Sequence, residues 1–160
     1  MSSKRILTLL GSSIVVSCLL TGLVLAANHS YHCTVGIEGN VLAEVEMQLS
    51  EDGSALLYTL EVYRIRDITM AHLHLGKPGA LGTPVVWLYP PSPPPRLIPG
   101  PFEGVLARGK ITENELIGPL RGRPLSSLIE EIQAGNVYVN IHTRDHAGGD
   151  ICGPVVLVDQ

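Results

Sequence analysis

The feature that most constrains this fold is the alternation of apolar and polar side chains in short runs separated by glycine and proline. Val41–Leu49 alternates in this way, and Leu56–Val62 does the same after a turn at Glu51–Ser54. Successive side chains of a strand point to opposite faces of a sheet, so this period of two predicts strands with one buried face. The chain also holds 17 Gly and 12 Pro, which favours short strands and turns over a helical bundle.

Further short runs extend the β pattern. Strands are predicted over Ile68–Gly76, Pro84–Tyr89, Gly104–Ile111, Asn136–Thr143 and Ile151–Val158. One helix is predicted over Ser126–Ala134, with Ser126 as its cap and Gly135 as its stop. The proline-rich segment Pro90–Pro101 lacks N–H donors, so it predicts a stiff surface loop, with a recognition peptide as the alternative. The pattern predicts a mainly β fold, an antiparallel Greek-key β-sandwich or barrel with one short helix.

The first 27 residues have the character of a targeting segment. The basic pair Lys4-Arg5 precedes Ile6–Ala27, a run of 22 residues without charge. A basic start, an apolar stretch and small residues at its end are typical of a secretory signal, here with cleavage after Ala26. The run is also long enough to be an uncleaved membrane anchor, and the residues before Cys18 loosely resemble a lipoprotein box. All three alternatives place the rest of the chain outside the cytoplasm, as a secreted, periplasmic or cell-surface protein.

The sequence also predicts the domain organisation and the classes of partner. We expect residues 1–27 to be a signal peptide or membrane anchor and residues 33–158 to form one β domain. The net charge is −4, with no long run of like charge. A basic nucleic-acid footprint is therefore absent, and no nucleic-acid partner is expected. Contact with a membrane is expected only through the N-terminal segment, if it is uncleaved or lipidated at Cys18.

Cysteine usage agrees with export. Once Cys18 is set aside, Cys33 and Cys152 remain near the two ends of the mature chain. An even cysteine count in an exported protein predicts a disulfide. The alternative is a pair of buried, unlinked thiols.

Four of the six histidines lie in two short segments whose parity matches. The apolar sets are Ala71, Leu73 and Leu75 in one segment and Val137, Val139 and Ile141 in the other. His72 and His74 therefore share the outer face of their strand, and His142 lies on the outer face of its own. If the two strands are neighbours, these three imidazoles converge, and His146 could fold back from the following loop to join them.

Three or four convergent imidazoles suit copper, zinc, nickel or iron(II). The predicted metal ligands are His72, His74 and His142, with His146 as a fourth, and the expected ion is copper, with zinc as the alternative. The candidates for orienting these ligands are Asn140, Asp145 and Asp150. A network of histidines that only hydrogen-bonds the loop backbones is the competing interpretation. Hydrolase motifs such as G-x-S-x-G are absent from the sequence.

The same residues resemble a known family. Ala71-His72-Leu73-His74-Leu75-Gly76, followed by Thr83-Pro84-Val85-Val86, resembles the "AHIH-G…NGPVV" stretch of CHRD (chordin-type) domains. Gly135-Asn136-Val137-Tyr138-Val139-Asn140-Ile141-His142-Thr143 resembles the family signature "G-x-x-Y-V-N-V-H-T", and Gly149-Asp150-Ile151-Cys152-Gly153 is similar to its "G-E-I-R-G" ending. The likeness covers roughly Val35–Val158. Cys152 stands where the family usually has Arg, which supports a disulfide with Cys33.

The resemblance also implies a fold and a site. CHRD domains are thought to resemble the Cu/Zn superoxide dismutase sandwich, and by position His72, His74 and His142 look like the copper ligands of that enzyme. No counterpart of its zinc-site loop is present in the sequence. We therefore expect an exported, non-enzymatic CHRD-type binding module with a metal ion on its histidine face. The alternatives are a superoxide dismutase-like redox enzyme and a structural or adhesive envelope protein that binds an extracellular or envelope protein partner without metal.

Overall fold

The computed structural model describes residues 29–37, 40–149 and 151–158. Its strands are β1 (Ser30–Ile37), β2 (Asn40–Leu49), β3 (Leu56–Leu75), β4 (Thr83–Tyr89), β5 (Ile98–Ile111), β6 (Val137–Thr143), β7 (Ile151–Pro154) and β8 (Val156–Val158). One α-helix, α1 (Leu125–Gln133), follows two 3-10 turns, at Glu113–Glu115 and Gly118–Leu120. The predicted signal or anchor at 1–27, Cys18 and Asp150 lie outside the described residues. Within these ranges no helix has the length and apolar character to cross a membrane.

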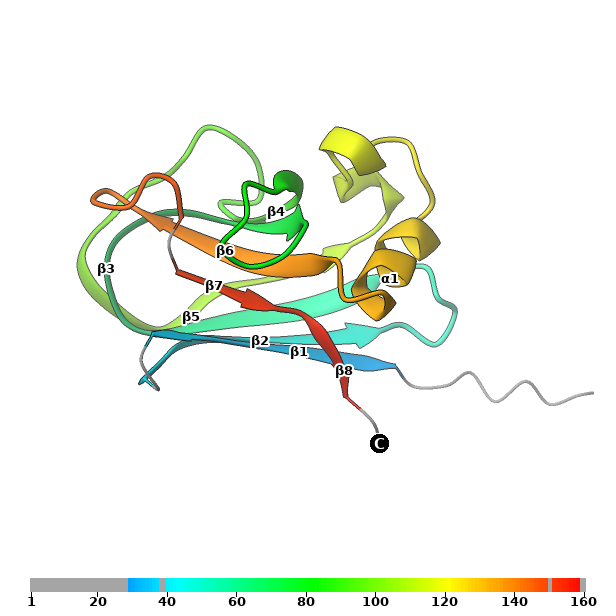
Figure 1. The fold of residues 1–160 in the computed structure, drawn as a ribbon, viewed down its shortest axis with the longest axis horizontal. Helices are drawn as coiled ribbons and strands as arrows, with labels where there is room; N and C mark the ends of the chain where they lie inside the picture. The colour runs from blue at the N-terminus through cyan, green and yellow to red at the C-terminus, as the bar shows by residue number, and fades with distance from the viewer. Residues whose placement is uncertain (1–28, 38–39, 150, 159–160) are drawn as a thin grey trace, which may run out of the picture.

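The strand β3 links the two layers of the fold. Its first half pairs with β2 and β5, and its second half pairs with β4 and β6, so the strand curves from one layer into the other (Figure 1). Arg64 (φ 58°) and Asp67 (φ 50°) have positive φ between the two halves, which is uncommon outside glycine. The Asp67 carboxylate also accepts a hydrogen bond from the Gly100 N–H, at 2.8 Å. The two strands predicted over this stretch are therefore one 20-residue bent strand.

The sheet nearly closes on itself as a barrel. Its strand order is β7-β6-β3-β2-β1-β8, with β4 and β5 both paired to β3, and every pairing is antiparallel. The strands β7 and β8 lie at opposite ends of this order, although only the buried Val155 separates them in the chain. The predicted last strand is thus divided between the two ends of the sheet. The predicted mainly β, antiparallel class with one short helix is confirmed.

The helix α1 covers one end of the barrel (Figure 1), and it ends at Gln133, one residue before the predicted end, with Ala134 as its C-cap. Gly135 follows it with φ +67°, and its N–H donates to the Ile132 carbonyl at 2.8 Å. The prediction for its start was wrong, because Pro124 is the N-cap and no side chain, that of Ser126 included, caps the helix. Leu128 and Ile132 pack into the core.

The proline-rich segment is only partly a loop. β5 begins at Ile98, so Pro99–Pro101 belongs to a strand, and Pro101 lies opposite Arg66 of β3. β5 pairs only with β3, which agrees with the confinement of strand prolines to edges. Residues 91–97 remain largely exposed. The predicted loop was therefore too long at its C-terminal end.

Candidate metal centre

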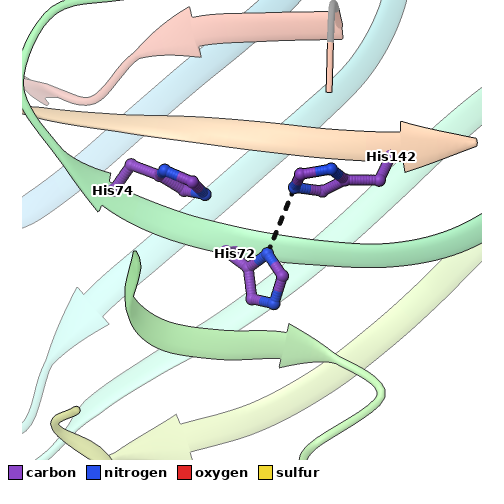
Figure 2. Close-up of side chains that lie close together, drawn as sticks. All are labelled: His72, His74 and His142. Atoms are coloured by element: carbon purple, nitrogen blue, oxygen red, sulfur yellow. Dashed lines mark hydrogen bonds between the residues drawn. The ribbon is translucent and has the colours of Figure 1, made fainter. Parts of the chain in front are cut away.

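The histidine segments lie on neighbouring strands, as the matching parity required. β3 and β6 pair antiparallel, with His72 opposite Asn140 and His74 opposite Tyr138. The side chains of His72, His74 and His142 therefore converge on one face of this pair (Figure 2). One ring nitrogen from each histidine can be chosen so that the three atoms lie within 4.8 Å of one another. The structure thus brings together the three predicted ligands.

This histidine face is buried, whereas the sequence predicted an exposed outer face. His72, His74 and His142 are only 4%, 6% and 6% exposed. Two loops contribute backbone carbonyls to the site, one at residues 76–82 and the other at 144–149. Trp87 of β4 adds an aromatic ring, whose centroid lies 4.2 Å from that of His72. β6 is consequently buried on both faces.

Two backbone carbonyls orient two of the imidazoles. His74 Nδ1 lies 3.0 Å from the Gly82 carbonyl oxygen, and His142 Nδ1 lies 2.8 Å from that of Ala147. A carbonyl only accepts, so each Nδ1 carries the hydrogen and each Nε2 presents a lone pair. The backbone thereby exposes the metal-binding form of both rings toward the centre of the cluster.

The third imidazole faces one of these lone pairs. His72 Nδ1 lies 3.3 Å from His142 Nε2, so in the metal-free protein it donates to that nitrogen. His72 Nε2 and His74 Nε2 are buried and have no hydrogen-bond partner among the described residues. Two buried acceptors without partners are uncommon in folded proteins. A bound cation would give such a lone pair a partner.

Burial keeps the imidazoles of His72 and His74 neutral. Burial lowers the pKa of His72 to about 3, with additional repulsion from His142 and His74. Burial also lowers the pKa of His74, although its hydrogen bond to Gly82 opposes the shift. Neutral imidazole is the form that binds metal ions, so at pH 7 no second proton on His72 or His74 competes with a metal.

The chain matches the CHRD domain family over residues 38–155, a range that includes all three histidines. This chain belongs to the CHRD domain family. No curated protein and no solved structure matches the chain. The likeness of this CHRD domain to the superoxide dismutase sandwich therefore stays a prediction.

The remaining predicted site residues of the CHRD domain lie apart from the triad or support it indirectly. His146 and Asp145 are exposed and line a surface pocket of about 220 Å³ together with Arg66, so the structure does not bring them to the triad. Asn140 is buried opposite His72, and its Nδ2 donates to the Gly148 carbonyl at 3.4 Å. Asn140 therefore fixes the covering loop, and no hydrogen bond to an imidazole is described for it.

Two aromatic residues of the site were not among the predicted site residues. Trp87 lies opposite His72 in the β3–β4 pairing, with its ring nearly perpendicular to the imidazole, at 78°. Tyr138 lies opposite His74, with the two ring centroids 5.2 Å apart. The sequence parity that places His142 on the outer face of its strand also places Tyr138 there, but no role in the site was predicted for it.

The predicted disulfide is not formed in the structure, where Cys33 and Cys152 are free thiols. Cys33 lies in the core, its Sγ donates to the Gly153 carbonyl at 3.1 Å, and burial raises its pKa to about 12. Cys152 lies opposite Asn140, so its side chain shares the histidine face. Neighbouring residues of β7 point to opposite faces, so Gly153 rather than Cys152 faces Cys33.

Proposed function

We propose that this CHRD domain is an exported, non-enzymatic binding module in which His72, His74 and His142 hold a transition-metal ion, with copper as the favoured ion and zinc as the alternative. The observation that carries the proposal is the convergence of three ring nitrogens within 4.8 Å. Two of the rings have their Nδ1–H groups bound to backbone carbonyls, the arrangement that orients metal-ligating histidines in other proteins.

The distances support this assignment. Imidazole nitrogens bind zinc at about 2.0–2.1 Å, so two ligands at a tetrahedral angle lie about 3.4 Å apart. The separation of His72 Nδ1 from His142 Nε2 is 3.3 Å. To bind through this Nδ1, His72 must move its proton to Nε2 or release it. The third ligand, a ring nitrogen of His74, must approach to a similar distance for all three to bind one ion.

A purely structural histidine network explains the site less well. It leaves His74 Nε2 buried without a partner, and an unsatisfied buried polar atom costs about 1–3 kcal/mol. A structural role alone needs no imidazole at these positions, because an apolar residue of similar size would avoid that cost. A bound ion makes use of the lone pair on His74 Nε2.

Copper is favoured by the number, charge and burial of the ligands. Among the described residues the cluster contains three imidazoles and no carboxylate. Protein-bound zinc is almost always four-coordinate, whereas Cu(I) is stable with three donors. Cu(I) also places only one charge in a buried site without a counter-ion, and the desolvation cost of an ion rises with its charge.

The same burial favours binding over catalysis. A redox or hydrolytic metal enzyme needs an open coordination position that a substrate can reach, and His72, His74 and His142 are only 4–6% exposed. Export is supported by the basic start and the uncharged run within residues 1–27, and the metal would be taken up outside the cytoplasm.

Metal titration of the untagged domain, residues 27–160, tests the proposal. Cu(I), Cu(II) and Zn(II) would be added against competing chelators. Binding would be followed by the fluorescence of Trp87, the one tryptophan of the chain, whose ring lies beside His72. We expect one ion per chain, and at least about 100-fold weaker binding by the His72→Ala/His74→Ala variant.

Two controls separate the site from other donors. His32→Ala removes a histidine of β1 that is not part of the triad, and it should bind as the wild type does. Cu(I) titrations would be repeated with Cys152→Ser, because a partly exposed thiol also binds Cu(I). No binding tighter than about 10 μM, or equal binding by the double histidine variant, would refute the proposal.

A further inference from the structure

Tyr138 occupies a buried position between the metal centre and the loop at residues 76–82. It is 2% exposed, and its ring is tilted by 34° against that of His74. Its hydroxyl donates to the Ala80 carbonyl at 2.9 Å and accepts from the Gly82 N–H at 3.2 Å. Both hydrogen-bonding directions of this hydroxyl are therefore used to hold the same loop.

The loop needs this support because its tip has little packing of its own. Residues 77–81 are all exposed, and an exposed loop opens at low free-energy cost unless it is tied down. Gly82 lies so close to the tyrosine that an added Cβ would be 2.8 Å from the Tyr138 hydroxyl and 2.2 Å from the Leu75 carbonyl oxygen. Gly82 therefore fits only as glycine, pressed against Tyr138.

The same loop residue that contacts Tyr138 also contacts a predicted metal ligand, His74. The Gly82 carbonyl that follows the tethered N–H accepts the hydrogen bond from His74 Nδ1. Gly82 thus donates its N–H to the tyrosine hydroxyl and accepts the His74 Nδ1–H at its carbonyl. The Gly82 N–H also donates to the Ala80 carbonyl at 2.9 Å within the loop, and the tyrosine hydroxyl ties both residues to β6. If the hydroxyl is removed, this tie is lost, and the Gly82 carbonyl and the His74 ring can shift from the orientation that directs Nε2 toward His72 and His142.

We propose that Tyr138 is a positioning residue of the metal centre, which orients His74 for metal binding through the backbone of Gly82. The effect of Tyr138 on metal affinity rests on the proposed function. Its effect on the orientation of His74 also applies to the metal-free protein. By reciprocity, metal binding should stabilise the 76–82 loop to the same extent that the tethered loop stabilises the bound metal.

The test compares Tyr138→Phe with Tyr58→Phe. Tyr58 is also buried, and its hydroxyl donates to the Leu88 carbonyl at 2.9 Å, so both variants lose one buried hydroxyl that donates to a backbone carbonyl. We expect similar falls in Tm of a few degrees. Only Tyr138→Phe should bind Zn(II) and Cu(I) about tenfold more weakly, with a faster release of the metal to a chelator.

A readout independent of metal is the ring-nitrogen NMR spectrum of the histidines in the chelator-treated protein. Wild type and Tyr58→Phe should show His74 with a slowly exchanging hydrogen on Nδ1. Tyr138→Phe should lose this protection. A third measurement uses only the wild type, in which Zn(II) should slow the amide exchange of Gly82, so the test does not depend on the folding of a variant.

The outcomes separate the two proposals. If no metal binds to the wild type, the proposed function fails, and the NMR comparison alone decides whether Tyr138 orients His74. If the wild type binds metal and both tyrosine variants bind it equally well, the positioning role of Tyr138 is refuted while the metal site stands. An unchanged His74 Nδ1 signal in Tyr138→Phe, or an unchanged Gly82 exchange rate on Zn(II) binding, also refutes it.

Discussion

The metal-free domain should lose stability in mild acid because of His72. Its pKa is lowered from 6.5 to about 3, first by burial and then by repulsion from His142 and His74. The folded protein therefore binds this proton more weakly than the unfolded chain does. The stabilising contribution is present above pH 6.5 and is lost as the pH falls from 6.5 toward 3, since protonation then favours the unfolded chain.

The size of the effect follows from linkage. Each pH unit within this window costs about 1.4 kcal/mol per affected histidine. Between pH 7 and pH 5, His72 alone should lower the free energy of unfolding by about 2 kcal/mol, and His74, whose pKa is also lowered, adds to this loss. A fall of about 2 kcal/mol is a large part of the 5–15 kcal/mol typical of a domain.

Urea unfolding with EDTA present, followed by Trp87 fluorescence at pH 7, 6 and 5, measures this slope. Among the carboxyl groups, Asp52 and Glu115 have lowered pKa values from unfolded values of 3.8 and 4.5. The stability that these two carboxyl groups contribute is lost below about pH 5. Their titration therefore does not overlap the range from pH 7 to 5 in which the histidine effect is measured. His72→Asn removes the titrating group and should flatten the slope. A wild-type unfolding free energy that is unchanged from pH 7 to 5, or an equal slope in His72→Asn, would show that the histidine is not buried as described.

Three further predictions test other parts of the structure. Gly82→Ala should lower the free energy of unfolding by about 2–3 kcal/mol in a urea titration, because the added Cβ meets the Leu75 carbonyl at 2.2 Å; a change under about 0.5 kcal/mol would contradict this packing. Leu128→Ala removes a fully buried side chain of α1 and should cost about 2–5 kcal/mol in the same assay, with a smaller loss indicating that the helix does not pack on the core. In folded protein handled without reductant, iodoacetamide should modify Cys152 and leave the buried Cys33 unmodified until urea is added, as read by mass spectrometry; absence of reaction at both cysteines even in urea would instead indicate a disulfide.

The local pattern of the sequence was sufficient for most strands and for the parity of the histidines. The alternation in Val41–Leu49 corresponds to β2, whose Ala43, Val45 and Met47 are buried. The continuity of β3 was not predictable in this way. It depends on a backbone bend with positive φ at Arg64 and Asp67, and this bend is held by pairing with strands far away in the sequence.

The burial of the triad was also beyond the local pattern. Parity states which side chains share a face, but it does not state what covers that face. The covering groups include the main-chain carbonyls of Gly82 and Ala147, which no side-chain pattern encodes. The cysteine prediction failed for a related reason, because the count of cysteines contains no information on the face to which Cys152 points.

Glycines in the loops at residues 76–82 and 144–149 help to place the carbonyls that orient the imidazoles. Gly82 supplies the acceptor for His74, and no side chain fits beside it. On the other loop, Gly149 has φ +79°, and an added Cβ would lie 2.3 Å from Asn140 Nδ2. Substitution at either glycine would displace a loop that holds an imidazole without touching a nitrogen that binds metal. The chemistry of the centre therefore depends on residues that have no side chain as well as on the three histidines, because at Gly82 and Gly149 the packing leaves no room for a Cβ.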